Sequence, residues 1–441
     1  MTVIARVREL VDATHLIDTH EHLLEEADRL ANRHPSLGCG DWSVLLSHYT
    51  CADLCSSGLP EGVRERFCKE EVPPEQKFRW IERYWKHVRH TGYGQAVRLS
   101  LQGLYGESDL TLETVPRIAE KYSDYLRPGF YDELLRQRSL IDHCQVNSVQ
   151  SLVFKLTSRP DLLRQDIDIT ELCRPEGFAA VEKEFAVSAN GLDEWLAVID
   201  KLFAQFAPLA VAVKCFLAYF RRLDFAPPDR TKAEQAFTVH QRSGALSSEQ
   251  SKVLGDFLFD WCLNRAQDHR LPVKIHTGYH DSNNRMPLHW VSKNVGDLCE
   301  IFRAYPATNF VLFHIGYPYQ NEVLAVAKQY SNVVVDMCFA WIVDPLSSTS
   351  FLKAFLTTVP ANKLFSFGGD YIPVELVHGH ARLARMGIAR ALSDLIEEGW
   401  LGESDAPHLI ECIMRRNAEE FFSPAPKRAK ESRDATSAQR T

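Results

Sequence analysis

Five side chains that can bind a metal ion lie at or near the ends of short apolar segments of this sequence. Four of them are predicted metal ligands, namely His20, His22, His276 and Asp370. The fifth is His314, in the segment between those of His276 and Asp370. Residues i and i+2 of a strand project to the same side, so the two histidines of the first segment can reach one ion. Three imidazoles and one carboxylate therefore predict a metal centre.

The mixture of nitrogen and oxygen ligands indicates which metals the centre would accept. It suits a divalent cation, with Zn²⁺ favoured and Mn²⁺ or Fe²⁺ as alternatives, and with one or two ions bound. Such a cation lowers the pKa of a bound water and polarises a carbonyl group. Asp370 is then predicted to bind the metal and also to receive a proton from that water. His314 is predicted to contact the substrate, the water or a developing oxyanion rather than to bind the ion.

Lys214 is the third predicted catalytic residue, and three interpretations of it stay open. It lies in the apolar segment AVAVKCFLAY, and a buried lysine needs a partner. The side chain could bind a carboxylate or carbonyl group of the substrate. It could be carbamylated and bridge a second metal ion, or it could pair with a carboxylate of the core. The first two interpretations require the side chain to point toward the metal centre.

Residues that follow two of the predicted strands are candidate substrate contacts, because loops at strand ends line the pockets of parallel barrels. Tyr219 and Arg221 follow the strand of Lys214, and His280 and Arg285 follow that of His276. Each has the alternative of being an ordinary solvated loop residue.

The elements that must position these residues are clearest in the second half of the chain. Apolar segments rich in β-branched residues alternate there with helical patterns. Strands are predicted at 209–219, 271–278, 309–316, 332–338 and 363–370, and helices at 248–269, 295–305, 321–330, 346–359 and 376–392. A charged loop is predicted at 221–245. This alternation is typical of βαβ units and a parallel sheet.

The first half of the chain is less regular. It offers strands at 15–22, near 145–154 and at 162–170, with a helical insertion over about 24–138. The predicted fold is therefore an α/β (β/α)8 TIM barrel over residues 1–422, with the large insertion after its first strand acting as a cap or an oligomer surface. The polar residues 423–441 are predicted to be a disordered tail. A second His-x-His pair, His378 and His380, falls in a predicted helix, where the two side chains diverge, so we interpret it as structural.

Composition narrows the class of protein. The 441 residues are 45% hydrophobic and 24% charged, with a formal net charge of −8, which is an ordinary globular balance. The acidic surface argues against nucleic acid or an anionic membrane as a partner. No apolar stretch is long enough to cross a membrane, and the N-terminus lacks a signal-peptide core. Eleven scattered cysteines without a CxxC pair indicate a reduced, cytoplasmic protein.

Four motifs around the predicted ligands resemble the amidohydrolase superfamily. They are IDTHEH, KIHTG, LFHIGYP and GGDY, and they are similar to its strand-1 His-x-His, strand-5 and strand-6 histidines and strand-8 aspartate. Over roughly residues 205–422 the sequence resembles amidohydrolase-related family 2, in particular the amidohydrolase domain fused to glutamine synthetase-like proteins. The resemblance implies a (β/α)8 barrel with one or two divalent metals.

The resemblance also implies a reaction, with alternatives. The leading prediction is a metal-dependent hydrolase that acts on an amide, ester or C–N bond of a small polar substrate. Non-oxidative decarboxylases and uronate isomerases share the same scaffold, and the ligand set does not separate them. A non-catalytic binding module that retains the barrel is the alternative of another class. The predicted partner is a small molecule, and a homo-oligomer is compatible with the sequence.

Overall fold

Parallel strands form the centre of the molecule. The computed structural model describes residues 2–32, 40–281 and 286–423. The strands are β1 (Leu16–Glu21), β2 (Ile141–Val146), β3 (Leu163–Gln165), β4 (Ile167–Asp168), β5 (Val213–Cys215), β6 (Val273–Ile275), β7 (Phe310–Leu312), β8 (Val333–Asp336) and β9 (Leu364–Phe365). Every strand pair is parallel. Their side chains are almost all buried, which explains the continuous apolar, β-branched runs in the sequence.

The strands follow one another in sequence order. One sheet has the order β1-β2-β3 and the other the order β4-β5-β6-β7-β8-β9. Asp166 alone separates β3 from β4, so these two form consecutive parts of one strand that pairs first with β2 and then with β5. The Asp370 N–H donates to the His20 carbonyl (2.8 Å) and the His22 N–H to the Tyr371 carbonyl (3.0 Å), which joins the first strand to the segment after the last. Eight strand positions in this order confirm the predicted barrel class.

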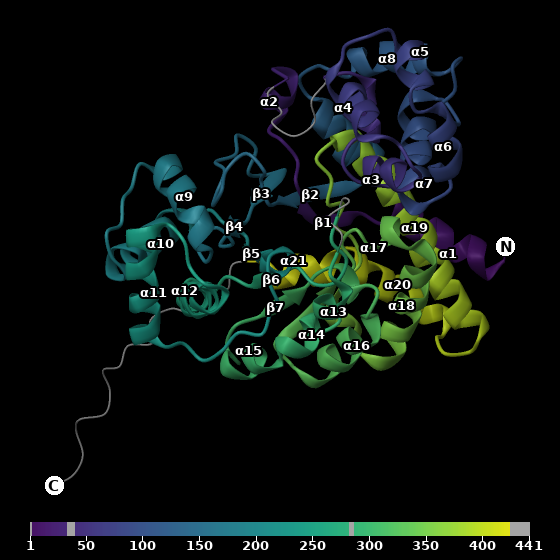
Figure 1. Ribbon diagram of the computed structural model, residues 1–441. Coiled ribbons are helices and arrows are strands. Elements are labelled where there is room, and N and C mark those ends of the chain that lie inside the picture. The colour runs from purple at the N-terminus through teal and green to yellow at the C-terminus, as the bar shows by residue number, and fades with distance from the viewer. Residues whose placement is uncertain (1, 33–39, 282–285, 424–441) are drawn as a thin grey trace.

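Helices alternate with these strands and cover their outer side (Figure 1). They are α1 (Val3–Ala13), α9 (Phe178–Phe185), α10 (Leu192–Phe206), α11 (Arg230–Ser243), α12 (Ser248–Asp268), α13 (Leu288–Val291), α14 (Asn294–Asp297), α15 (Cys299–Ala304), α16 (Gln320–Gln329), α17 (Ala340–Val343), α18 (Pro345–Thr358), α19 (Val374–Glu397), α20 (Ala406–Glu411) and α21 (Asn417–Phe421). Local signals set several boundaries, such as the capping box of Ser247 and Gln250 before α12. Among the described residues, no helix is long and apolar enough to cross a membrane.

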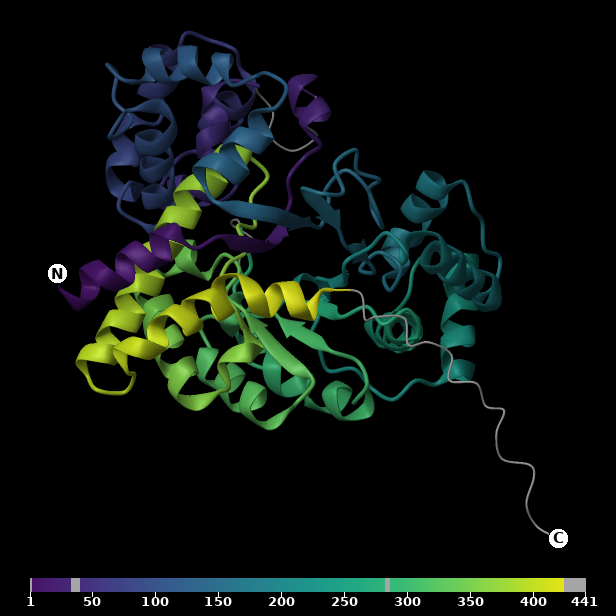
Figure 2. The ribbon, with the colours of Figure 1, turned by 180° about the vertical axis from the view of Figure 1, so that it is seen from behind.

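The described part of the segment between β1 and β2 consists of helices and the loops that join them. It contains α2 (Glu26–Leu30), α3 (Tyr49–Ser56), α4 (Glu61–Lys69), α5 (Pro74–Arg79), α6 (Glu82–Val88), α7 (Gly92–Ser100) and α8 (Val115–Asp124), with π-helical turns at Leu101–Tyr105 and Asp132–Arg138. Helices α3 to α8 gather at one side of the barrel, and α19 extends from the barrel into them (Figures 1 and 2). Helix α19 packs against α7, α1 and α18, so it ties the insertion to the barrel.

Two sequence predictions need correction. The second strand occupies Ile141–Val146 rather than 145–154, because the residues after Val146 turn away from the sheet. The predicted loop at 221–245 contains helix α11. The buried face of this helix consists of Ala233, Ala236 and Phe237, which is too small to stand out among its charged residues. The tail beyond Ser423 lies outside the described residues.

A buried ion pair lies inside the barrel. The Lys274 ammonium lies 2.8 Å from Asp166 Oδ2 and donates to the Thr19 carbonyl at 2.9 Å. Both side chains of this ion pair are fully buried. Removing one partner of this buried pair would leave an uncompensated charge inside the barrel.

Candidate metal centre

A cavity of about 680 Å³ opens at the carboxyl ends of the strands. Its lining residues come from several strand ends, from the segment before α3 and from the loops after β5 and β6. They are His20, His22, His48, Tyr49, Lys214, Phe216, Tyr219, Phe220, His276, His280, Asp281, Pro287, Trp290, His314 and Asp370. All five predicted metal-capable residues and Lys214 are among them. The carboxyl ends of the strands are where active sites of parallel barrels form.

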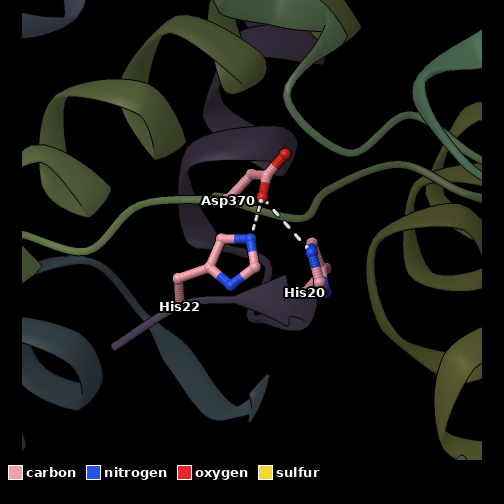
Figure 3. A group of neighbouring side chains, drawn as sticks. All are labelled: His20, His22 and Asp370. Carbon is pink, nitrogen blue, oxygen red and sulfur yellow. Dashed lines mark ion pairs between the residues drawn. The ribbon is translucent and has the colours of Figure 1, made fainter. Parts of the chain in front are cut away.

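Three of the predicted ligands meet at one carboxylate oxygen. Asp370 Oδ1 lies 3.2 Å from His20 Nε2 and 3.1 Å from His22 Nε2. Figure 3 shows both imidazole rings pointing toward this carboxylate, His20 from β1 and His22 from the residue that follows it. His20 and Asp370 are buried, while His22 is partly exposed to the cavity. These three residues form one of the two described groups whose donor atoms lie close enough to hold a metal ion.

The tautomer of His22 favours a cation in this position. Its Nδ1 lies 2.7 Å from the Asn147 carbonyl oxygen, which can only accept, so Nδ1 donates. A neutral ring then presents the lone pair of Nε2 to Asp370 Oδ1, itself an acceptor. Burial opposes the charged imidazolium, but the hydrogen bond and charge of Asp370 raise the pKa of His22. A metal ion would satisfy both lone pairs, and a ring N–H bonded to a backbone carbonyl is the usual support of a metal-binding histidine.

His276 and His314 present a similar shortage of protons. His314 Nδ1 lies 3.0 Å from the Cys338 carbonyl, His314 Nε2 lies 2.9 Å from His276 Nδ1, and His276 Nε2 lies 3.0 Å from the Tyr279 carbonyl. These three contacts need three protons, whereas two neutral imidazoles have two. Burial lowers the pKa of both rings, that of His314 to about 4. One of the three contacts therefore lacks a proton. A cation bound to either ring would replace one contact, and two protons would then suffice.

The structure does not bring His276 into the group of His20, His22 and Asp370. Its ring faces the same cavity but is paired with His314 and the Tyr279 carbonyl. His20 and His22 thus contact Asp370, whereas His276 contacts His314 and a backbone carbonyl.

Lys214 extends into the centre from β5. Its Nζ lies 3.4 Å from His20 Nε2 and 4.1 Å from the centroid of the Phe313 ring. Within the described chain, no carboxylate oxygen lies within ion-pair distance of this amine, so the interpretation of a partner in the core has no support there. Burial lowers the pKa of Lys214, although the negative charge of Asp370 opposes that effect.

The turn that carries Asp370 is held in an unusual conformation. The φ angle of Asp370 is +61°, in the left-handed region that non-glycine residues seldom adopt. A Cβ on Gly369 would lie 1.7 Å from Glu21 Oε1, so the turn needs glycine at this position. Glu21 accepts from the Tyr371 N–H at 2.6 Å, and Asp18 accepts from the Gly369 N–H at 3.2 Å. Two acidic residues of β1, Asp18 before His20 and Glu21 between the two histidines, thus position the Asp370 turn, a role that the sequence motif does not reveal.

The predicted substrate contacts have different positions. Tyr219 and His280 line the cavity and stack on each other, with ring centroids 4.5 Å apart. Arg221 is not among the cavity residues, because Asp256 of α12 holds its guanidinium at 2.6 Å. Arg285 lies outside the described residues.

Three further residues of the cavity were not predicted from the sequence. His48 and Tyr49 come from the insertion and stack with ring centroids 3.9 Å apart. His48 Nε2 lies 3.6 Å from Asp281 Oδ2, in the loop after β6. No motif surrounds His48, so its approach to the barrel depends on the packing of the insertion.

Comparison with known proteins shows the family and supports the fold. A family model described as Amidohydrolase matches residues 169–423, which carry His276, His314 and Asp370. The chain belongs to the amidohydrolase family. The protein fluG of Emericella nidulans is 27% identical over 227 residues, which are 49% of this chain and 25% of fluG. The chain thus spans about a quarter of that relative.

Comparison with solved structures extends the likeness in fold to nearly the whole chain. A uronate isomerase of Thermotoga maritima matches with a TM-score of 0.77 and 12% identity, covering 96% of this chain and 97% of that one. A Lactobacillus casei protein, whose assignment as a metal-dependent hydrolase is itself provisional, matches with a TM-score of 0.65 and 14% identity over 94% and 97% of the two chains. At these identities the likeness shows the shared fold alone.

Proposed function

We propose that the protein is a metal-dependent hydrolase that cleaves an amide, ester or C–N bond of a small polar substrate. The observation that carries the proposal is the meeting of His20, His22 and Asp370 at the cavity, where His22 Nε2 and Asp370 Oδ1 face each other as two acceptors. In the proposal these three residues hold a divalent cation, with His276 as the fourth ligand, and zinc is favoured by the nitrogen and oxygen donors. Membership of the amidohydrolase family supports the same reaction class.

The cation would supply an activated water and polarise the carbonyl group that is attacked. The remaining steps belong to residues of the chain. Asp370 is ionised, because His20 and His22 keep its pKa well below the usual range despite burial, so it can receive a proton from the nucleophile. His314, buried beside it, can stabilise negative charge that develops on the substrate oxygen.

Lys214 is assigned to the substrate in this proposal. Its amine lies beside the ligand nitrogen of His20, so an ammonium there would repel a cation at the same nitrogen. A neutral amine, which burial favours, can donate to a substrate carbonyl group. A carbamylated lysine would remove the repulsion in a different way, and the two forms are distinguishable by chemical rescue.

A uronate-type isomerase is the second candidate, and the fold likeness to the Thermotoga maritima enzyme is the observation that favours it. Uronates carry a carboxylate, which proteins commonly bind through arginine. No arginine is among the described cavity residues, and Lys214 is their one lysine. The described lining is rich in aromatic rings instead, which favours the hydrolase. A decarboxylase on the same scaffold has no separate observation in its favour, and the retained ligand set argues against a non-catalytic module.

The test is a substrate panel with metal-loaded protein. Amides, esters, lactones, aromatic acids and uronates would be assayed after loading with Zn²⁺ or Mn²⁺, beside the Asp370→Asn variant. Asp124→Asn is the matched control, because Asp124 is exposed on α8 and far from this centre in the sequence. We expect hydrolysis in at least one substrate class that Asp370→Asn abolishes and the control retains. Uronate turnover without hydrolysis would replace the proposal with the isomerase.

A further inference from the structure

Cys338 lies beside the proposed metal centre, although it does not line the cavity. Its thiol, one nitrogen of His314 and one carboxylate oxygen of Asp370 all lie within 4.8 Å of one another, and all three residues are buried. Cys338 follows β8, and its N–H donates to Asp336 Oδ1 at 2.8 Å, which fixes the backbone there. This is the second described group with metal-binding spacing, and Asp370 belongs to both.

The two groups use opposite oxygens of the shared carboxylate. Asp370 Oδ1 faces His20 and His22, whereas Oδ2 lies 3.9 Å from His314 Nδ1. A carboxylate can place one oxygen on each of two cations, and paired metal ions in enzymes lie about 3.5–4 Å apart. The space beside Cys338 depends on Gly368, since a Cβ there would approach the Cys338 Sγ to 3.0 Å.

We propose that His314, Cys338 and Asp370 form a second cation site, which shares Asp370 with the first and binds a thiolate-accepting divalent ion such as Zn²⁺ or Co²⁺. The inference rests on the first metal site of the proposed function and adds a sulfur ligand to the centre. Thiolate ligands select soft and borderline metals over Mg²⁺ and Ca²⁺. Occupation of both sites makes the centre binuclear without modification of Lys214.

Binding at this site changes two present contacts. The Cys338 S–H bond breaks as the metal–sulfur bond forms, and its proton leaves to solvent. One ring nitrogen of His314 exchanges its present partner, either the Cys338 carbonyl or His276 Nδ1, for the cation. That exchange also removes the shortage of protons along the His314–His276 pair.

Cobalt substitution tests the sulfur ligand directly. The full-length protein would be freed of metal, titrated with Co²⁺ and followed by metal content and by the thiolate-to-cobalt charge-transfer absorption in the near ultraviolet. We expect two ions per chain and this absorption band. Cys338→Ser should lose the band and one ion. Cys215→Ser is the matched control, because Cys215 is a buried cysteine on β5 that belongs to neither group, and it should keep both.

The outcomes separate this site from the proposed function. A cobalt protein without the band, or a band that persists in Cys338→Ser, overturns the second site. A single sulfur-bound ion per chain overturns the first site and the binuclear centre. One ion with nitrogen and oxygen ligands alone overturns the second site and leaves the hydrolase proposal intact, whereas no bound ion overturns both.

A measurement without any variant covers the case in which Cys338→Ser does not fold. X-ray absorption of the zinc-loaded natural sequence should show a sulfur neighbour at about 2.3 Å. A shell of nitrogen and oxygen alone contradicts the site.

Discussion

His22 and Asp370 face each other through atoms that can both donate an electron pair. The Asn147 carbonyl determines this arrangement, because it takes the one proton of the neutral His22 ring at Nδ1. Without a cation, a hydrogen bond at this contact requires a protonated imidazole. Burial opposes that charge, whereas Asp370 favours it and the pKa of His22 is raised. A cation would instead leave the ring neutral, with its proton on Nδ1 toward Asn147.

Removal of either group should abolish metal binding at this position. We expect His22→Ala and Asp370→Asn to lower metal affinity and kcat/KM by at least about 100-fold, with the fold retained. Metal content by elemental analysis and circular dichroism would check this. His90→Ala, an exposed histidine of the insertion, is the control for His22. Near-full metal content in His22→Ala would show that the first site is misplaced.

The two remaining roles of Lys214, a substrate-binding amine and a carbamylated lysine, differ in charge. Lys214→Ala should lose most turnover under either role. If the amine donates to the substrate, added alkylamines should restore part of the activity, and short carboxylic acids should not. Rescue by the carboxylic acids alone would instead indicate a carbamylated lysine and contradict the role proposed here.

The turn between β9 and α19 positions the Asp370 carboxylate. Within this turn, Gly369 lies closest to a neighbouring side chain. Gly369→Ala should destabilise the protein by about 1–3 kcal/mol, because the new Cβ would overlap Glu21. Urea unfolding would measure the change. Gly296→Ala is the matched control in α14, where a Cβ meets nothing within 4 Å, and it should be neutral or slightly stabilising. Equal stabilities of the two variants would argue against the close approach of Glu21.

The end of β8 gives a pH prediction. Burial raises the pKa of Asp336 to about 7, above its unfolded value of about 3.9. Between these values the folded state binds more protons, so this group makes stability fall as pH rises from about 4 to 7. Asp336→Asn should flatten that part of the stability curve by up to a few kcal/mol, measured by urea unfolding across pH. An unchanged slope would contradict the burial of this carboxyl.

Sequence patterns found the strands that are buried on both sides and missed elements with weaker signals. β5 to β9 were predicted because their apolar runs alternate with helices. β2 was displaced because its start, Ile141–Asp142–His143, mixes polar with apolar residues. Spacing singled out His20, His22 and Asp370, whereas Cys338, Asp18 and Glu21 lie beside them through tertiary packing that no local motif records.

At the scale of the whole molecule, the insertion and the barrel contribute to one cavity. His48 and Tyr49 reach it from the insertion, while the metal-capable residues come from the strand ends. α19 packs against both parts. This position agrees with the cap, one of the two roles predicted for the insertion. The residues through which it reaches the cavity, His48 and Tyr49, could not be predicted because their contacts are distant in sequence.

Metal removal should therefore act on the entire fold. A ligand that binds the folded chain alone stabilises it by about 2.7 kcal/mol at one hundred times its Kd. We expect chelator-treated protein to melt at a lower temperature and zinc to restore the Tm, while Asp370→Asn shows little response. A Tm that is insensitive to metal in the natural sequence would count against a metal bridging β1 and the turn after β9.

Anomalous diffraction at the zinc edge from crystals of the metal-loaded protein would locate the proposed ion. We expect a strong peak within coordinating distance, about 2.0–2.2 Å, of His20 Nε2, His22 Nε2 and an Asp370 carboxylate oxygen. A fully loaded crystal with no peak at these atoms, or with its peak elsewhere in the molecule, would contradict the proposed site.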